Sequence, residues 1–97
     1  MVQNLIGLNG NEVVNQFVID TKKSVYFQSY KSVVCKINKD TKKVTLSAHW
    51  DYSVTTSKYL YKFLRDNGIY VYNKQDVLTK IKGKEFILIN KDSISIL

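Results

Sequence analysis

Residues 50–64 constrain the fold more than any other stretch, because they combine a strand end, a hydroxyl-rich turn and the first turns of an amphipathic helix. A helix start leaves backbone N–H groups free, and a side-chain oxygen at the N-cap accepts from them. The candidate N-cap residues are Ser53, Thr55 and Thr56. Gly68 supplies a left-handed stop. The pattern predicts a helix over residues 55–67.

The predicted helix has two unlike faces. Its apolar face follows the i, i+4, i+7 and i+8 spacing of a helix and contains Thr56, Leu60, Phe63 and Leu64. Another face carries the cations Lys58, Lys62 and Arg65. One side can therefore pack on a sheet while the other presents positive charge to a partner.

Strand-like segments lie on both sides of this helix. They are rich in β-branched and aromatic residues that alternate with polar ones, and turn residues separate them. Before the helix we predict strands at 12–19, 24–30, 32–38 and 44–50, with residues 1–11 as a loose segment or a short first strand. Residues 28–32 are either a bulge in one long strand or a break between two. After the helix we predict a strand at 69–72, a helix at 74–82 capped by Asn73 and ended by Gly83, and a hairpin of strands at 85–90 and 93–97.

This order of elements predicts an α+β fold in a single domain of residues 1–97. We expect a mostly antiparallel sheet of about five or six strands with both helices on one face. The other face should be wetter.

The charge favours acidic partners. The chain has a formal net charge of +7 from 15 Lys and Arg residues against 8 Asp and Glu residues. Such an excess is typical of proteins that contact nucleic acid, a nucleoprotein or an anionic surface. The alternative is a solubility charge, because Arg65 is the only arginine and arginine is preferred for specific phosphate recognition. No apolar run approaches the ~18–20 residues of a membrane span, so we expect no membrane insertion.

The sequence shows no motif typical of a catalytic site or a metal site. Cys35 is the only cysteine, which fits a reducing cytoplasm, and its alternating strand context favours a buried core position over a nucleophile. His49 with Cys35 cannot form a zinc site, and a His49–Asp51 dyad would lack a nucleophile. The N-terminus does not resemble a secretory signal. We therefore expect no enzyme activity, cofactor or metal.

Three clusters are candidates for binding. Ser53, Thr55 and Thr56 at the helix start can hold an anion with Lys31 or Lys58 as counter-charge, or can simply cap the helix. Lys58, Lys62 and Arg65, extended by lysines 74, 80, 82 and 84, can grip phosphates while Tyr61 stacks on a base, or can be a solvated helix face. The tyrosines Tyr26, Tyr30, Tyr70 and Tyr72 are a candidate base-binding sheet face, a core or a protein-docking patch.

Residues 26–37 and 50–60 carry a recognisable pattern. Ser29, Tyr30 and Ser32 begin an apolar strand, Trp50 follows, and Ser53, Thr55 and Thr56 lead into the helix. This pattern resembles that of a family of small phage, prophage and plasmid proteins with no settled activity. Many members of that family carry His at the position of Tyr59, so the resemblance implies no proton-transfer role for Tyr59 in this chain. It does imply an origin in a mobile element of a low-GC bacterium and a host-takeover or counter-defence role.

We therefore hold three functional hypotheses. The leading one is a non-enzymatic, anti-CRISPR-like inhibitor that binds a host protein or nucleoprotein complex in the bacterial cytoplasm. The second is an accessory protein that binds DNA or RNA directly. The weakest is an assembly protein that forms a homodimer or larger oligomer through an exposed strand edge, with residues 93–97 as the candidate edge.

Overall fold

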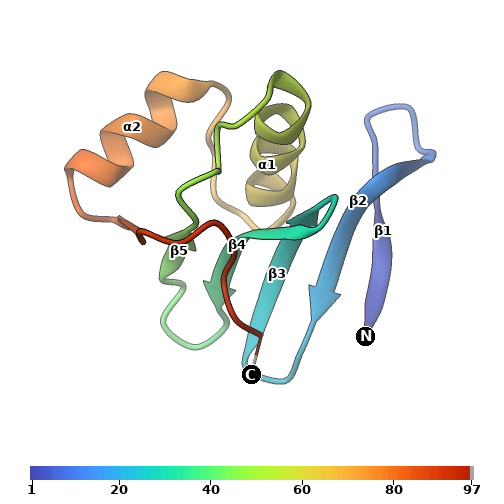
Figure 1. Ribbon diagram of the computed structural model, residues 1–97, viewed down its shortest axis with the longest axis horizontal. Helices are drawn as coiled ribbons and strands as arrows, with labels where there is room; N and C mark the ends of the chain where they lie inside the picture. Colours follow the sequence, from blue (N-terminus) through green and yellow to red (C-terminus); the bar gives the residue numbers. More distant parts are fainter. Residues whose placement is uncertain (97) are drawn as a thin grey trace.

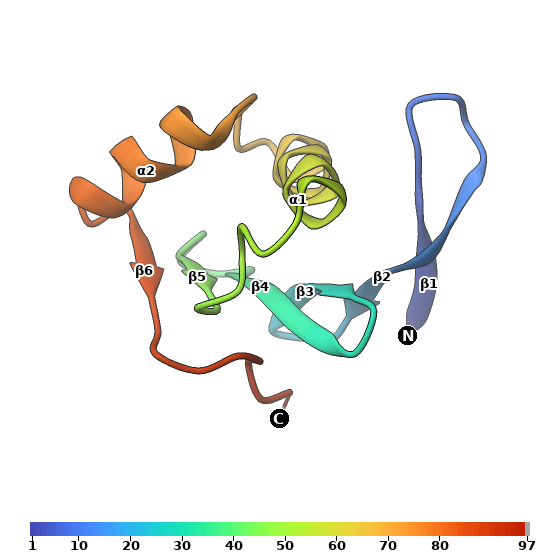
Figure 2. The same cartoon turned by 45° about the horizontal axis from the view of Figure 1, so that its top comes forward.

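The computed structural model describes residues 1–96, and these form one six-stranded sheet with two helices (Figure 1). The strands are β1 (Val2–Ile6), β2 (Glu12–Asp20), β3 (Ser24–Ser29), β4 (Ser32–Asn38), β5 (Val44–Leu46) and β6 (Phe86–Leu88), and the helices are α1 (Val54–Asp66) and α2 (Lys74–Lys82). The sheet order is β1-β2-β3-β4-β5-β6, with only β5 and β6 parallel. Both helices lie on one face of the sheet (Figure 2). The predicted α+β fold is confirmed.

The first five strands form a meander because each turn satisfies its own backbone groups. At the β2–β3 turn, the Thr21 hydroxyl donates to the Ser24 carbonyl at 2.8 Å and accepts from the Ser24 N–H at 3.1 Å. At the β4–β5 turn, the Asn38 side-chain oxygen accepts from the N–H groups of Asp40 and Thr41 at 2.9 and 3.0 Å. These side-chain contacts hold both hairpins without proline.

The tract around residues 28–32 contains both features that the sequence left open. The chain breaks between β3 and β4 at Tyr30, which has a φ of 56°. The register also shifts, since Phe27 pairs with Cys35 while Gln28 pairs with Val33. Val34 is therefore the extra residue of a bulge. The bulge and the turn together direct the end of this hairpin towards the start of α1.

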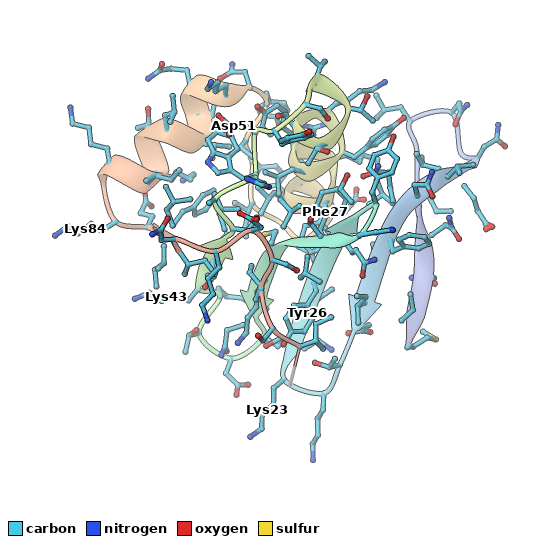
Figure 3. The ribbon with its side chains drawn as sticks, viewed as in Figure 1. Lys23, Tyr26, Phe27, Lys43, Asp51 and Lys84 are labelled. Carbon is cyan, nitrogen blue, oxygen red and sulfur yellow. The ribbon has the colours of Figure 1, made fainter. Side chains whose placement is uncertain are left out.

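Helix α1 covers the centre of the sheet through the predicted apolar face. Leu60, Phe63 and Leu64 are at most 1% exposed, and Thr56 is 4% exposed. The Phe63 ring stacks on Phe27 of β3 with centroids 5.6 Å apart, and Figure 3 shows Phe27 beneath α1. Burying a side chain of this size contributes about 1.5–3 kcal/mol. The apolar face of α1 thus anchors the helix to the sheet.

The helix ends follow the sequence signals closely. Ser53 and Asn73 are the N-caps, each accepting from the backbone N–H three residues on. Gly68 has the left-handed φ of 82° that stops α1. Gly83 follows α2, but its φ is −77°, and the left-handed residue is Lys84.

Two predicted strands are wrong, and the strand predicted at 44–50 ends at Leu46 because residues 48–50 form a turn. Residues 69–72 form a linker between the helices, in which Val71 is buried and Tyr70 and Tyr72 are exposed. Residues 93–96 form no strand; residue 97 of that predicted strand lies outside the described residues. The segment after β6 instead crosses the sheet face opposite the helices (Figure 2).

Contacts with β4 explain that path. The Ile94 N–H donates to the Val33 carbonyl at 2.9 Å, and the Val33 N–H donates to the Ser93 hydroxyl at 2.9 Å. Ile94 packs with Tyr26, Val33 and Ile19. The second sheet face is therefore partly covered, and the edge strands in the described chain are β1 and β6 rather than residues 93–97.

Candidate functional site

The hydroxyl cluster at the start of α1 is bonded mainly within the protein. The Ser53 oxygen accepts from the Thr56 N–H at 3.1 Å, and its hydroxyl donates to Thr56 Oγ1 at 3.1 Å. Thr56 Oγ1 also lies 2.9 Å from Ser29 Oγ of β3 in a buried hydrogen bond. Thr55 is exposed on the outside of the first turn. Ser53 and Thr56 therefore cap the helix and fix its start to the sheet.

The three predicted cations of α1 have three different environments. Lys62 is bound to Asp66 on the same helix, with Nζ–Oδ1 at 2.6 Å. Arg65 donates from Nη1 to the Val71 carbonyl at 2.9 Å, and its Cζ lies 5.0 Å from the centre of the Tyr72 ring. Lys58 lies 5.1 Å from the Tyr59 ring centre, and it forms no ion pair with the described acidic residues. Lys58 is thus the cation of this set most available to a ligand.

A shallow groove of about 720 Å³ runs along the exposed side of α1. We call it the tyrosine–cation groove. Its lining comes from the turn before α1, from α1, from the linker between the helices and from the first residue of α2. The lining residues are Asp51, Tyr52, Ser53, Val54, Ser57, Lys58, Tyr61, Arg65, Tyr72 and Lys74. It brings together three tyrosines and three cations with one carboxylate. Figure 3 shows Asp51 near the top of the view, between α2 and α1.

The groove keeps a positive balance although some of its charges have partners. Lys74 Nζ lies 3.2 Å from Asp51 Oδ2, which neutralises one cation and ties α2 to the turn before α1. Burial raises the pKa of the Tyr61 phenol, so this group is a neutral donor at physiological pH. Tyr52 is 77% and Tyr72 64% exposed, so each ring keeps an exposed surface for a ligand although Arg65 lies against one side of Tyr72.

A second, smaller pocket of about 290 Å³ adjoins the groove, because Tyr52 lines both. We call it the hydroxyl pocket. Its lining is Ser29, Tyr30, Ser32, Val34, His49, Tyr52 and Thr56. The residues of the β3–β4 turn and of the start of α1, which lie far apart in sequence, therefore meet around one hollow. Lys31 is exposed beside Tyr30 in that turn.

The predicted aromatic sheet face does not exist as such. Tyr26 is 2% exposed and lies under the C-terminal segment, so it is a core residue. Tyr70 and Tyr72 lie in the linker between the helices and line different hollows. Tyr70 belongs with Lys42, Lys43, Lys80 and Lys84 around a second basic groove of about 600 Å³. Figure 3 shows Lys43 and Lys84 on the left of the molecule, below Asp51.

The groups with catalytic potential are dispersed. His49 Nε2 lies 3.2 Å from Asp92 Oδ1, whereas Asp51 pairs with Lys74, so His49 and Asp51 do not form a dyad. Cys35 is fully buried, and burial raises the pKa of its thiol. Within residues 1–96 no three His, Cys, Asp or Glu side chains gather in a way that could hold a metal ion. No helix in the same range is long and apolar enough to cross a bilayer.

Sequence reasoning did not place Tyr52 or the Asp51–Lys74 ion pair in the site. Tyr52 lies in a turn, and its place between the groove and the hydroxyl pocket depends on how β5 and α1 are joined. The partner of Lys62 is readable, because Lys and Asp four residues apart on a helix are neighbours. Asp51 and Lys74 lie too far apart in sequence for any local pattern to pair them.

Residues 2–86 match the family of unknown function DUF8033, and the chain belongs to this family. This match covers the whole sheet and both helices apart from the end of β6. No curated protein and no solved structure matches the chain.

Proposed function

We propose that this protein works by binding single-stranded nucleic acid along the tyrosine–cation groove. The observation that carries the proposal is the placement of the exposed rings of Tyr52 and Tyr72 in one groove with Lys58, which has no acidic partner within residues 1–96. Single strands bind proteins by stacking bases on aromatic rings while cations contact the phosphates. The net charge of +7 adds a long-range attraction to the same partner.

Arg65 prepares the groove for this role. Its bond to the Val71 carbonyl fixes the linker, and its guanidinium supports the Tyr72 ring from one side. The other side of that ring is left for a base. A ring held in place before binding loses less conformational entropy when a ligand arrives.

The biological setting that we propose is counter-defence by a mobile element. The resemblance of the Ser29–Tyr30–Ser32 and Trp50–Thr56 pattern to phage, prophage and plasmid proteins supports it. In this setting the protein is an anti-CRISPR-like inhibitor in the host cytoplasm, and it engages the RNA or DNA strand of a host nucleic-acid-processing complex. A plain accessory role in the element's own DNA or RNA metabolism uses the same groove.

A salt titration of oligonucleotide binding tests the proposed chemistry. Labelled strands of about ten nucleotides should bind, and single strands should bind more tightly than duplex of the same length. With two or three phosphates contacted, the logarithm of the association constant should fall with the logarithm of salt at a slope of about −1.5 to −2. Binding without salt dependence, or none at all, would refute the proposal.

A second assay separates the two biological settings. An inhibitor should be retained on a host nucleic-acid-processing complex, and nuclease treatment of that complex should release it. An accessory protein should bind the free strand as tightly as any complex that contains it.

A further inference from the structure

We propose that the hydroxyl pocket takes one unstacked pyrimidine base of the strand that lies in the tyrosine–cation groove. This inference rests on the proposed function and specifies what that site recognises. Its first support is position, because Tyr52 forms a wall of both hollows. A strand whose phosphates follow Lys58 can therefore turn one base into the pocket without leaving the groove.

The size of the pocket suits a single small ring. Its volume of about 290 Å³ lies at the low end for ligand pockets. One pyrimidine ring fits inside it, and the sugar and phosphate of that nucleotide can stay outside at the groove.

The walls of the pocket offer stacking surfaces that the core does not use. Tyr30 is 53% and Tyr52 77% exposed, although both are large aromatic residues. The His49 ring lies beside Tyr52 with centroids 5.4 Å apart and a tilt of 34°. Tyr30 is held outside the core by its left-handed φ of 56°, which is uncommon for a residue with a side chain. A base can stack on such an exposed ring whatever its sequence, because every base has a π-face.

The floor of the pocket has one hydroxyl proton to spare. Ser53 donates to Thr56 Oγ1, and Thr56 Oγ1 shares a second contact with Ser29 Oγ. Three hydroxyl protons thus serve two contacts, so among the described residues one proton on Ser29 or Thr56 has no acceptor. Both residues are 4% exposed and line the pocket, so a ligand in the pocket would meet this donor.

A donor without a protein acceptor at the floor of the pocket favours a ligand that places a carbonyl oxygen there, because the carbonyl can accept the proton. Thymine and uracil carry ring carbonyls, whereas adenine offers none. The spare proton therefore points to thymine or uracil rather than adenine.

Affinities for oligothymidine and oligoadenosine of equal length test this inference in the intact protein. We expect oligothymidine to bind more tightly. Tyr30→Asn removes one stacking wall while keeping a residue that tolerates a left-handed φ. It should weaken oligothymidine binding about tenfold, leave oligoadenosine binding nearly unchanged and leave the salt slope unaltered. Ser32→Leu, which fills the pocket from another wall, should have the same effect.

Tyr70→Ala is the matched control, because Tyr70 is 69% exposed but lies in the other basic groove. It should leave the thymidine preference intact. If Tyr30→Asn and Ser32→Leu weaken both oligonucleotides equally, or neither, while binding keeps its salt dependence, the base pocket is refuted and the groove stands. If the unchanged protein binds neither oligonucleotide, the proposed function fails and this inference fails with it.

Discussion

Ser29 Oγ and Thr56 Oγ1 lie 2.9 Å apart in a buried hydrogen bond that joins the end of β3 to the first turn of α1. The bond fixes the height of the helix over the sheet. It also sets the distance between the β3–β4 turn and the turn before α1, and hence the width of the hydroxyl pocket. Structure and candidate site thus depend on the same pair of hydroxyl groups.

Thr56→Val should lower the free energy of unfolding by about 1–3 kcal/mol, because the buried Ser29 hydroxyl would lose its partner. Valine keeps the shape of threonine, so the change removes little packing. Thr55→Val is the control, since Thr55 is exposed on the same turn, and should stay within about 0.5 kcal/mol of the wild type. Urea denaturation measures both. Equal effects of the two variants would contradict a structural role for the Ser29–Thr56 bond.

The helices were predictable because their signals are local. Ser53 and Asn73 cap the helices, and each apolar face repeats with the period of an α-helix. These features act within a few residues, so α1 and α2 end within a residue of the predicted bounds.

Strand pairing at the C-terminus was not predictable because it depends on the path of the chain between strands. Two helices separate β5 from β6, so the chain crosses over and β6 arrives parallel to β5. Residues 85–97 have the alternation of a hairpin in the sequence. In the structure Phe86 of β6 pairs with Val44 of β5, and Ile94 packs on Tyr26 on the other face of the sheet.

The candidate site was predictable only in part. The spacing of Lys58, Lys62 and Arg65 predicts that they lie on neighbouring turns of one helix. In the structure Lys62 forms an ion pair with Asp66, and Arg65 donates a hydrogen bond to the Val71 carbonyl. The convergence of Tyr52 and Tyr72 beside Lys58 depends on the tertiary fold, which no local pattern describes.

Gly68→Ala should destabilise the protein by about 1 kcal/mol, because alanine is strained at the φ of 82° that ends α1. Gly83→Ala is the matched test, since Gly83 has a φ of −77° at the end of α2. A Cβ there would lie 3.4 Å from the Thr79 carbonyl oxygen, an ordinary contact. This variant should be neutral or stabilised by about 0.4–1 kcal/mol through a less flexible unfolded chain. The midpoint of thermal unfolding should therefore fall for Gly68→Ala and stay the same or rise for Gly83→Ala. A larger fall for Gly83→Ala would refute the assignment of the two helix ends.

Cys35 should make the protein less stable at alkaline pH. Burial raises the pKa of its thiol above the value in the unfolded chain, so the folded state keeps the proton while the unfolded state releases it. The resulting stability is full below the unfolded pKa of about 8.5 and declines as pH rises beyond it. Between about pH 8 and pH 10 the wild type should lose about 2 kcal/mol more than Cys35→Val. Tyrosine ionisation is common to both proteins and cancels in the difference. Parallel stability curves over this range would mean that the thiol is not shielded from water.

Lys58→Ala and Lys62→Ala form a matched pair that tests the groove, because both remove a lysine from α1 but only Lys58 lacks an acidic partner among the described residues. Lys58→Ala should weaken single-strand binding and reduce the salt slope by about 0.7, the value for one lost phosphate contact. Lys62→Ala should leave the slope unchanged, since Lys62 lies outside the groove lining and its ammonium is bound to Asp66 at 2.6 Å. Loss of that exposed helix pair should cost only about 0.3–0.5 kcal/mol of stability.

Anisotropy titrations over a range of salt concentrations measure both slopes. Equal reductions would mean that binding responds to total charge alone, and the tyrosine–cation groove would then have no special role.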